Sequence, residues 1–493
     1  MNNIPFISII LSMVAAIVML LLGKKASTAM RGSQLVLGVI AVLSFVLIPY
    51  FLQNGGTITY MLGHYPSPWG NELRFGLLES ILACVFATVL LLAIMGGKKD
   101  IVEDIQSRKQ SQYFALLMLL LLSLLALIYT NDIFTAYVFI EINTIASCGI
   151  VMVKESGETL RATIKYLFMS LMASGLFLIA IALLYSITGH LLIPALATSI
   201  KSLVASGQYR WPLYTACALM TISLGVKSAM FPFHTWLPDA HGTATTSSSS
   251  ILSGVVVKGY IILLIKIYYR VFGIEVVKQI GVLNVVFWLG IAGMIFGSLF
   301  AIKEKNLKRM IAYSSVAQIG YIYAGIGVGS YAGLAAALFH MIVHAYTKPL
   351  LFSSAGGLIG VSKHSKMIAD MKGAARRNPI AGIGFLIGTL SMVGVPLFGG
   401  FTSKLLLAQS ASDNGYAFLV ALALSSFLNA IYYLPVLFKI YSASEETDEE
   451  YLENDNYKAS YSTAIIAFAI INVVLGLGGI YVMHLLNQGV QLL

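Results

Sequence analysis

The sequence predicts an all-α, polytopic membrane protein with 14 transmembrane helices. Of its 493 residues, 58% are hydrophobic and only 11% are charged, and the mean hydropathy is +0.85. A soluble globular domain has about 25% charged residues and cannot bury so much apolar surface. These values exclude a soluble enzyme, a disordered chain and a secreted disulfide scaffold.

Fourteen apolar segments approach the roughly 20 residues that a helix needs to cross a bilayer. They are residues 4–22, 35–52, 75–95, 112–130, 132–153, 163–188, 213–233, 248–269, 284–302, 308–328, 331–352, 380–408, 416–441 and 460–486. In the first segment the basic residues Lys24 and Lys25 follow the apolar run, whereas a secretory signal has them before it. The sequence therefore predicts an uncleaved first helix. Residues 189–208 are predicted to form an amphipathic surface helix.

The basic residues support this count and predict the orientation of the chain. The odd-numbered loops hold 20 Lys and Arg residues, and the even-numbered loops hold five. Cytoplasmic loops are enriched in Lys and Arg, so the odd-numbered loops are predicted to be cytoplasmic and both termini outside, in a cell (inner or plasma) membrane. The net charge of +10 comes from basic residues in these short loops between apolar segments. The sequence has no basic patch interleaved with aromatic residues, which is the pattern that would indicate nucleic-acid binding.

The remaining six basic residues lie within predicted spans, and all six are lysines. They are Lys227, Lys258, Lys266, Lys348, Lys404 and Lys439. A charge in the hydrocarbon costs at least about 2.5–3.5 kcal/mol, so each needs a partner, a water-filled cavity or a function. A buried Lys can lose its proton, whereas Arg practically cannot. Lys266 is near the outer end of its span and is expected to snorkel to the interface.

Seven titratable residues within the spans are candidates for a proton relay. They are Glu141, Lys227, Lys258, His340, His344, Lys348 and Lys404. Glu141 is a mid-span carboxylate, and its expected partner is an intramembrane Lys. Glu141 either modulates the protonation of that Lys or forms an ion pair with it that holds two helices together. The i, i+4, i+8 spacing of the two His and Lys348 places them on one helix face.

No metal or cofactor site is expected. The stripe of His340, His344 and Lys348 has no carboxylate or Cys beside it, so its spacing does not favour a metal. The three cysteines, Cys84, Cys148 and Cys217, lie in apolar runs without ligand spacing.

Two of the spans that carry a Lys are predicted to be broken helices. The residues that break them are Pro232 in the seventh span and Pro396, Gly399 and Gly400 in the twelfth. A proline in mid-span frees a backbone carbonyl, which is tolerated where it lines a water-filled cavity. The two breaks lie five spans apart, and an odd offset reverses direction, so the spacing indicates inverted repeats of helices 4–8 and 9–13.

This repeat pattern predicts four regions along the chain. They are the first three helices (1–111), the first repeat (112–270), the second repeat (284–441), and an acidic loop with the last helix (442–493). The loop holds seven acidic residues within 445–455. They are predicted to be a solvated loop, with a docking surface for a basic partner as the alternative.

Four motifs resemble those of the antiporter-like subunits of respiratory complex I, Mrp-type Na⁺/H⁺ antiporters and membrane-bound hydrogenases. They are F-P-F-H-T-W-L-P-D-A-H (231–241), L-K-R-M-I-A-Y-S-S-V-A-Q-I-G-Y (307–321), F-H-M-I-V-H-A-Y-T-K-P-L-L-F (339–352) and G-V-P-L-F-G-G-F-T-S-K (394–404). With the 14-helix layout, the resemblance covers essentially the whole chain and is closest to the Mrp D-type subunit. It implies two inverted five-helix repeats, broken helices 7 and 12, and a water-filled axis of Lys, His and Glu.

The resemblance also implies a role for each candidate. Glu141 would be the fifth-helix carboxylate, with Lys227 as its seventh-helix partner. Lys258 would be the eighth-helix bridge, the stripe of His340, His344 and Lys348 would lie on the eleventh helix, and Lys404 would be the twelfth-helix proton site.

The chain departs from the family pattern in two places. After the seventh helix the family often reads P-D-A-x-x-x-A-P-x-x-V-S-A, whereas this chain reads G-T-A-T-T-S-S-S-S-I-L-S-G without that Pro. The start of the eighth helix is therefore expected to be shaped differently, which bears on local proton access. Near the third helix Gly76 stands where Asp is common, and Glu79 is a possible substitute.

The predicted function is that of a proton-translocating subunit in a multisubunit membrane cation/proton (Na⁺/H⁺) antiporter. The expected partners are other membrane subunits, protons, Na⁺ and the lipid bilayer. The main alternative is a pump subunit of a redox-driven complex, such as a membrane-bound hydrogenase or a complex I-like NADH/ferredoxin oxidoreductase. A structural scaffold is disfavoured because unpaired charges hold helices together poorly. A stand-alone solute carrier is disfavoured because the candidates form a titratable line and not a substrate pocket.

Overall fold

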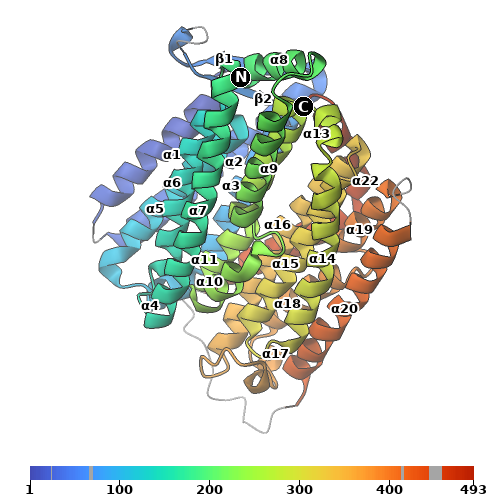
Figure 1. Cartoon of the computed structure of the whole chain (residues 1–493). Helices are drawn as coiled ribbons and strands as arrows, with labels where there is room; N and C mark the ends of the chain where they lie inside the picture. Colours follow the sequence, from blue (N-terminus) through green and yellow to red (C-terminus); the bar gives the residue numbers. More distant parts are fainter. Residues whose placement is uncertain (24, 66–69, 412–415, 444–457) are drawn as a thin grey trace.

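The computed structural model describes residues 1–23, 25–65, 70–411, 416–443 and 458–493. The described part is mostly helical, and 11 of its helices are long and apolar enough to cross a membrane. Both termini lie at the end of the molecule that carries β1, β2 and α8, and α4 and α17 lie at the opposite end (Figure 1). The predicted helical, polytopic architecture is confirmed. The seven acidic residues within 445–455 lie outside the described residues.

The N-terminal region combines helices with a hairpin that the sequence did not predict. Its elements are α1 (Ile4–Leu21), α2 (Ala26–Asn54), β1 (Thr57–Met61), the short helix η1 (Leu62–His64), β2 (Glu72–Gly76), α3 (Leu77–Gly96) and α4 (Lys98–Asp104). The strands pair antiparallel, from Thr57 opposite Gly76 to Met61 opposite Glu72. Glu79 is not free at the start of α3, because its Oε2 accepts a hydrogen bond from the Gly76 N–H at 2.9 Å.

The middle of the chain contains long helices and one nearly continuous helix with π-helical segments. The elements are α5 (Ser107–Tyr129), α6 (Ile133–Met152), α7 (Gly157–Thr188), α8 (Ile193–Ala205), α9 (Arg210–Lys227), η2 (Phe233–Trp236), α10 (Leu237–Thr243), α11 (Thr246–Ile251), η3 (Leu252–Val256), α12 (Val257–Lys266) and η4 (Ile267–Phe272). Both η3 and η4 are π-helical. The surface helix predicted over 189–208 is confirmed as α8, which buries Ile193, Leu196 and Ile200 on one face.

The C-terminal half is also helical. Its elements are α13 (Ile274–Ile280), α14 (Val282–Lys303), α15 (Leu307–Gly327), α16 (Tyr331–Gly360), η5 (Ile368–Met371), α17 (Ala374–Arg377), α18 (Pro379–Val393), α19 (Gly399–Ser410), α20 (Tyr416–Tyr441), α21 (Lys458–Leu477) and α22 (Gly479–Val490).

Three predicted spans fall on helices that are polar or short. Residues 213–233 correspond to α9, which begins at Arg210 and ends at Lys227. Residues 308–328 correspond to α15, whose face includes Ser, Gln and Tyr side chains. Residues 380–408 are divided between α18, with 15 residues, and α19, with 12. Hydropathy alone therefore does not identify these three as spans.

Two helices form the centre of the molecule and position the site. The apolar windows of the continuous helix 246–272 and of α16 are entirely buried, whereas only a third of those of α1 and α2 is buried. α16 contacts α15, α18, α19, α21 and α22, and also the start of the continuous helix at α11. A titratable side chain on α16 is therefore surrounded by protein and not by lipid.

Candidate functional site

The helix that carries Lys227 is interrupted next to that residue. α9 ends at Lys227, and η2 begins only after Pro232. Ala229 in the connection has φ +58°, which a regular helix does not allow. The Trp236 indole N–H donates to the Val226 carbonyl at 3.0 Å and thereby uses one of the carbonyls at the end of α9. The interruption places an ammonium group at a helix end inside the protein.

A second interruption separates α18 from α19. α18 ends at Val393 and α19 begins at Gly399, so Pro396 lies in the connection. Gly394 has φ +95°, a conformation that favours glycine. Gly400 approaches Ser391 so closely that an added Cβ would lie 1.8 Å from the Ser391 carbonyl oxygen. Any larger side chain at position 400 would push the two half-helices apart.

Lys227 is bound by a hydroxyl group and not by a carboxylate. Its Nζ donates a hydrogen bond to Thr144 Oγ1 at 2.8 Å and lies 5.5 Å from the centre of the Tyr260 ring. Glu141 is three residues before Thr144 on α6, on the same helix face. Both Glu141 and Lys227 are described, and no ion pair within 4.0 Å joins them. Glu141 is half-buried, and its Oε1 has no hydrogen-bond partner.

Lys258 lies in the middle of the continuous helix and is fully buried. Its Nζ donates to the carbonyl of Ser253, five residues earlier in the π-helical segment η3. The Ser253 hydroxyl lies 3.0 Å from the Ser315 hydroxyl on α15. Lys258 is thus connected to α15 through the backbone and side chain of one serine.

The stripe on α16 is buried along its whole length. His340 Nδ1 lies 2.9 Å from Ser403 Oγ, whereas neither ring nitrogen of His344 has a hydrogen-bond partner among the described residues. Lys348 donates to the Ile311 carbonyl at 3.0 Å and to Ser314 Oγ at 2.8 Å. The stripe therefore contacts α19 at one end and α15 at the other.

Lys404 uses the carbonyl groups that the second interruption leaves free. Its Nζ donates to the carbonyls of Met392 and Val393, the last residues of α18, at 2.7 and 3.1 Å. The same ammonium lies 5.3 Å from the centre of the Tyr321 ring. The His340 ring stacks on the Tyr321 ring, with 5.2 Å between the two ring centres. The structure thus brings Lys404 and His340 together around one aromatic ring.

The expectation that Lys266 snorkels to the interface is wrong. Lys266 is 2% exposed, and its Nζ donates to the carbonyls of Leu127, Ile128 and Thr130 at the end of α5. These carbonyls have no partner within their own helix, so a buried ammonium is bound in place of water. Lys266 is therefore a cap of α5.

Sequence reasoning missed two further buried residues. Lys308 counts as a loop residue by its position at the start of α15, yet it is 4% exposed and donates to the Ala244 carbonyl at 3.3 Å. His241 ends the first of the four motifs, and its fully buried ring stacks on Phe352 with 4.7 Å between centres. The spacing of the motif gave no signal that His241 faces α16.

The partners of the buried lysines suit proton exchange. Hydroxyl and carbonyl oxygens accept a hydrogen bond from an ammonium, and a hydroxyl can also donate to a neutral amine. A carboxylate would instead stabilise the charged form alone. Lys227 is bound by a hydroxyl, Lys348 by a hydroxyl and a carbonyl, and Lys258 and Lys404 by carbonyls. In the described part of the chain, no group of three or more His, Cys, Asp or Glu is arranged to hold a metal ion.

Comparisons with known proteins relate this chain to one protein family. Residues 130–429 match the family model described as "NADH:quinone oxidoreductase/Mrp antiporter, TM". The chain is 31% identical to the N subunit of NADH-quinone oxidoreductase from Desulforudis audaxviator, over 89% of this chain and 86% of that protein. It is 25% identical to the D subunit of the Na(+)/H(+) antiporter from Bacillus subtilis, over 100% of this chain and 97% of that protein.

Two solved structures share the fold. One is a chain of the membrane-bound sulfane sulfur reductase, an archaeal respiratory membrane complex, with a TM-score of 0.89, 26% identity and coverage of 99% of this chain and 97% of that chain. The other is a chain of the Mrp complex from Dietzia sp. DQ12-45-1b, with a TM-score of 0.87 and 22% identity, again over 99% and 97%.

Proposed function

The chain belongs to the NADH:quinone oxidoreductase/Mrp antiporter family, and from this premise we propose that it is the proton-translocating subunit of a multisubunit membrane cation/proton antiporter. The similarity to the D subunit of a Na(+)/H(+) antiporter extends over the whole chain. The proposed cations are protons and Na⁺, and the proposed partners are the other membrane subunits of the complex.

The observation that carries the proposal is the chemistry around the buried lysines. Lys227, Lys258, Lys348 and Lys404 are all at most 9% exposed, and each is bound by hydroxyl or carbonyl oxygens. A buried ammonium with no carboxylate beside it is held weakly in its charged form, because burial disfavours charge. Each Lys can therefore receive and release a proton without breaking a salt bridge.

The proposed relay follows these residues across the bundle. Protons hop along Lys227, Lys258, the stripe of His340, His344 and Lys348, and Lys404. Glu141, one helical turn before Thr144 on α6, modulates the charge of Lys227 on α9. No cofactor has a role in these steps, so the energy comes from an ion gradient or from partner subunits.

The proposed topology has 14 spans with both termini outside a plasma membrane and the end that carries α4 and α17 in the cytoplasm. Helices 4–8 (112–270) and 9–13 (284–441) form two inverted repeats, flanked by residues 1–111 and 442–493. The two helix interruptions support this arrangement, because each lies beside a buried Lys, Lys227 in one half and Lys404 in the other.

The proposal is tested by Lys227→Ala and Glu141→Ala in the reconstituted complex. Both variants are expected to abolish cation-driven proton movement, followed with a pH-sensitive dye in proteoliposomes, while the complex still assembles. Lys439→Ala is the matched control, because Lys439 is a half-buried Lys near the end of α20. Wild-type transport rates in either test variant would overturn the relay.

A second candidate is the ion-pumping membrane subunit of a redox-driven complex. The 31% identity to an N subunit of NADH-quinone oxidoreductase and the likeness to a chain of the sulfane sulfur reductase complex favour it. The iron and nickel contents of the purified native complex separate the two candidates. Substantial iron indicates an electron-transfer complex, nickel indicates a hydrogenase, and a metal-free complex of apolar subunits favours the antiporter.

A further inference from the structure

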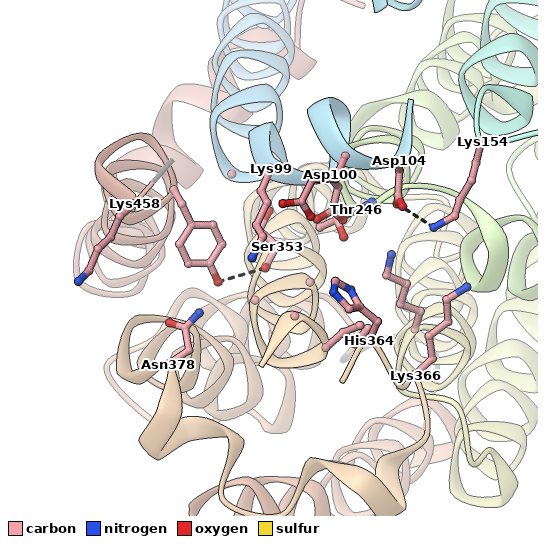
Figure 2. A pocket seen from close by; sticks show the side chains of 18 residues that line it. Lys99, Asp100, Asp104, Lys154, Thr246, Ser353, His364, Lys366, Asn378 and Lys458 are labelled. Carbon is pink, nitrogen blue, oxygen red and sulfur yellow. Dashed lines mark hydrogen bonds and ion pairs between the residues drawn. The ribbon is translucent and has the colours of Figure 1, made fainter. Parts of the chain in front are cut away.

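A cavity opens at the end of the molecule that carries α4 and α17, and the relay described above does not use it. It holds about 960 Å³ of empty space including its open mouth, and α3, α4, α11, α16 and α21 contribute to its lining. Its rim carries both charges, including the Lys154–Asp104 ion pair at 2.8 Å (Figure 2). Such a rim keeps the mouth hydrated.

The inner wall of the cavity presents hydroxyl groups. Thr246 lines the cavity and is 1% exposed, and its Oγ1 has no hydrogen-bond partner. Asp100 holds this residue in place by accepting a hydrogen bond from the Thr246 N–H at 3.1 Å. Ser353 on α16 lines the same wall (Figure 2). The Tyr461 hydroxyl donates to the Ser353 carbonyl at 3.2 Å. A buried, unpartnered hydroxyl at a cavity wall is a site for water.

From this wall, hydroxyl groups continue toward the centre of the bundle. Ser353 Oγ lies 3.4 Å from Ser250 Oγ, which is one turn further along the helix than Thr246. Ser253 is three residues beyond Ser250, and its hydroxyl lies 3.0 Å from that of Ser315. Lys258 bonds to the carbonyl of Ser253.

The π-helical segment η3 brings Lys258 toward these hydroxyl groups. In an unbroken α-helix the 12 residues from Thr246 would leave Lys258 about 120° around the axis, because each residue turns the chain by about 100°. A π-helix bonds i to i+5 and winds the chain less per residue. The segment Leu252–Val256 therefore rotates Lys258 back toward the face that carries Thr246, Ser250 and Ser253.

The other serines of this run face different helices. Ser247 accepts from Tyr113 on α5, Ser248 donates to the Ile150 carbonyl on α6, and Ser249 donates to the His241 carbonyl on α10. In the run 247–250, Ser250 is the residue whose hydroxyl meets α16. Ser250 can therefore be tested against neighbouring serines of the same helix whose hydroxyl groups face other helices.

Two glycines leave space for the hydroxyl groups of Thr246 and Ser353 at the cavity wall. An added Cβ at Gly356 would lie 2.6 Å from Thr246 Oγ1, and one at Gly96 would lie 2.8 Å from Ser353 Oγ. Both distances are too short for a carbon–oxygen contact, so a methyl group at either position would displace one of these hydroxyl groups.

We propose that Thr246, Ser353, Ser250, Ser253 and Ser315, here called the hydroxyl track, form the proton access route from this cavity to Lys258. The inference rests on the proposed proton-translocating function and adds the side and the residues through which protons reach the relay. A hydronium ion in the cavity gives up a proton and becomes water. Each hydroxyl or water accepts one proton as it donates another, and the neutral amine of Lys258 takes the last proton to become ammonium.

Cysteine accessibility tests the route without reference to transport. Single Ser353→Cys, Ser250→Cys and Ser248→Cys variants of the intact complex are treated, from the face that carries α4 and α17, with a membrane-impermeant cationic thiol reagent. Labelling of the native cysteines in the unchanged complex gives the background. The route predicts that the cysteines at 353 and 250 react several-fold faster than the one at 248. Equal or slower reaction at 250 would overturn it.

Transport by hydroxyl variants gives the second test. Ser250→Val and Gly356→Ala are expected to lower the transport rate several-fold, and Ser250→Thr, which keeps the hydroxyl, is expected to restore most of it. Ser248→Val and Gly175→Ala are controls, because Ser248 faces α6 and an added Cβ at Gly175 meets no atom within 4 Å. Loss of transport in Lys227→Ala together with wild-type transport in Ser250→Val would overturn the route and leave the proposed function standing.

Discussion

The ammonium of Lys227 donates to the hydroxyl of Thr144 at 2.8 Å, while Glu141, one turn earlier on α6, forms no ion pair with it within 4.0 Å. A neutral partner stabilises charged and uncharged forms of Lys more evenly than a carboxylate does. In the proposed relay, the Glu141 carboxylate favours the charged form of Lys227 from beyond 4.0 Å. A small movement of α6 relative to α9 would then change how strongly that charged form is favoured.

The Thr144 hydroxyl is expected to be needed for transport. Thr144→Val keeps the shape of the side chain but removes the acceptor of the Lys227 hydrogen bond, so a several-fold slower transport is expected. Thr144→Ser keeps the hydroxyl and is expected to transport near the wild-type rate. Dye-monitored proton uptake by proteoliposomes measures both, and equal rates in the Val and Ser variants would show that the hydrogen bond has no role.

The face of the Tyr321 ring is expected to matter more than its hydroxyl. The ring lies 5.3 Å from the Lys404 ammonium and 5.2 Å from the His340 ring, whereas its hydroxyl has no partner among the described residues. A cation–π contact contributes about 0.5–2 kcal/mol. Tyr321→Phe should therefore keep near wild-type transport and Tyr321→Leu should slow it. The ratio of the two rates is the measurement, and a ratio of one contradicts the assigned contact.

Lys266 is expected to affect stability and not transport. Lys266→Met leaves the carbonyls of Leu127, Ile128 and Thr130 buried without a donor, and an unsatisfied buried polar group costs about 1–3 kcal/mol. The unfolding temperature of the complex in detergent should fall, while transport per folded complex stays constant. Lys439→Met is the control. An unchanged unfolding temperature together with lost transport would instead assign Lys266 to the relay.

Asp239 is expected to make the end that carries α4 and α17 sensitive to acid. Burial raises the pKa of this carboxyl, but hydrogen bonds and charges from Lys165 and Arg309 outweigh burial and hold its pKa below the usual value. A lowered folded-state pKa stabilises the fold fully above the unfolded pKa of about 3.9, and the contribution is lost as the pH falls through the folded value.

The Asp239→Asn variant isolates this contribution. The difference in unfolding temperature between the wild type and Asp239→Asn should be constant at neutral pH and should shrink as the pH falls below about 4. Unfolding curves over this range measure the difference. A difference that grows on acidification would mean that the carboxyl is not held charged by its two partners.

Hydropathy and helix breakers in the sequence predict much of the fold. Apolar runs locate the long helices, and the Pro and Gly residues near Lys227 and Lys404 mark both interruptions. The i, i+4, i+8 spacing predicts that the stripe on α16 shares one face. These features are local, so they can be read from neighbouring residues.

The remaining features depend on contacts between distant residues. Lys266 binds carbonyls more than 130 positions away, so its depth in the helix could not reveal its partner. The buried position of Lys308 depends on α10, whose Ala244 end it contacts. The π-helical segment η3 has no Pro or Gly-rich signature, and hydrophobic periodicity alone cannot locate the bulge that turns Lys258.

The central claim, that Lys227 exchanges its proton during transport, is tested most directly by Lys227→Arg in the reconstituted complex. Arg keeps the positive charge and can donate to Thr144, but it practically never loses its proton. A proton-relay role predicts that transport is lost in Lys227→Arg as completely as in Lys227→Ala, with assembly intact. Recovery of transport in Lys227→Arg would contradict the relay and assign Lys227 a purely structural charge.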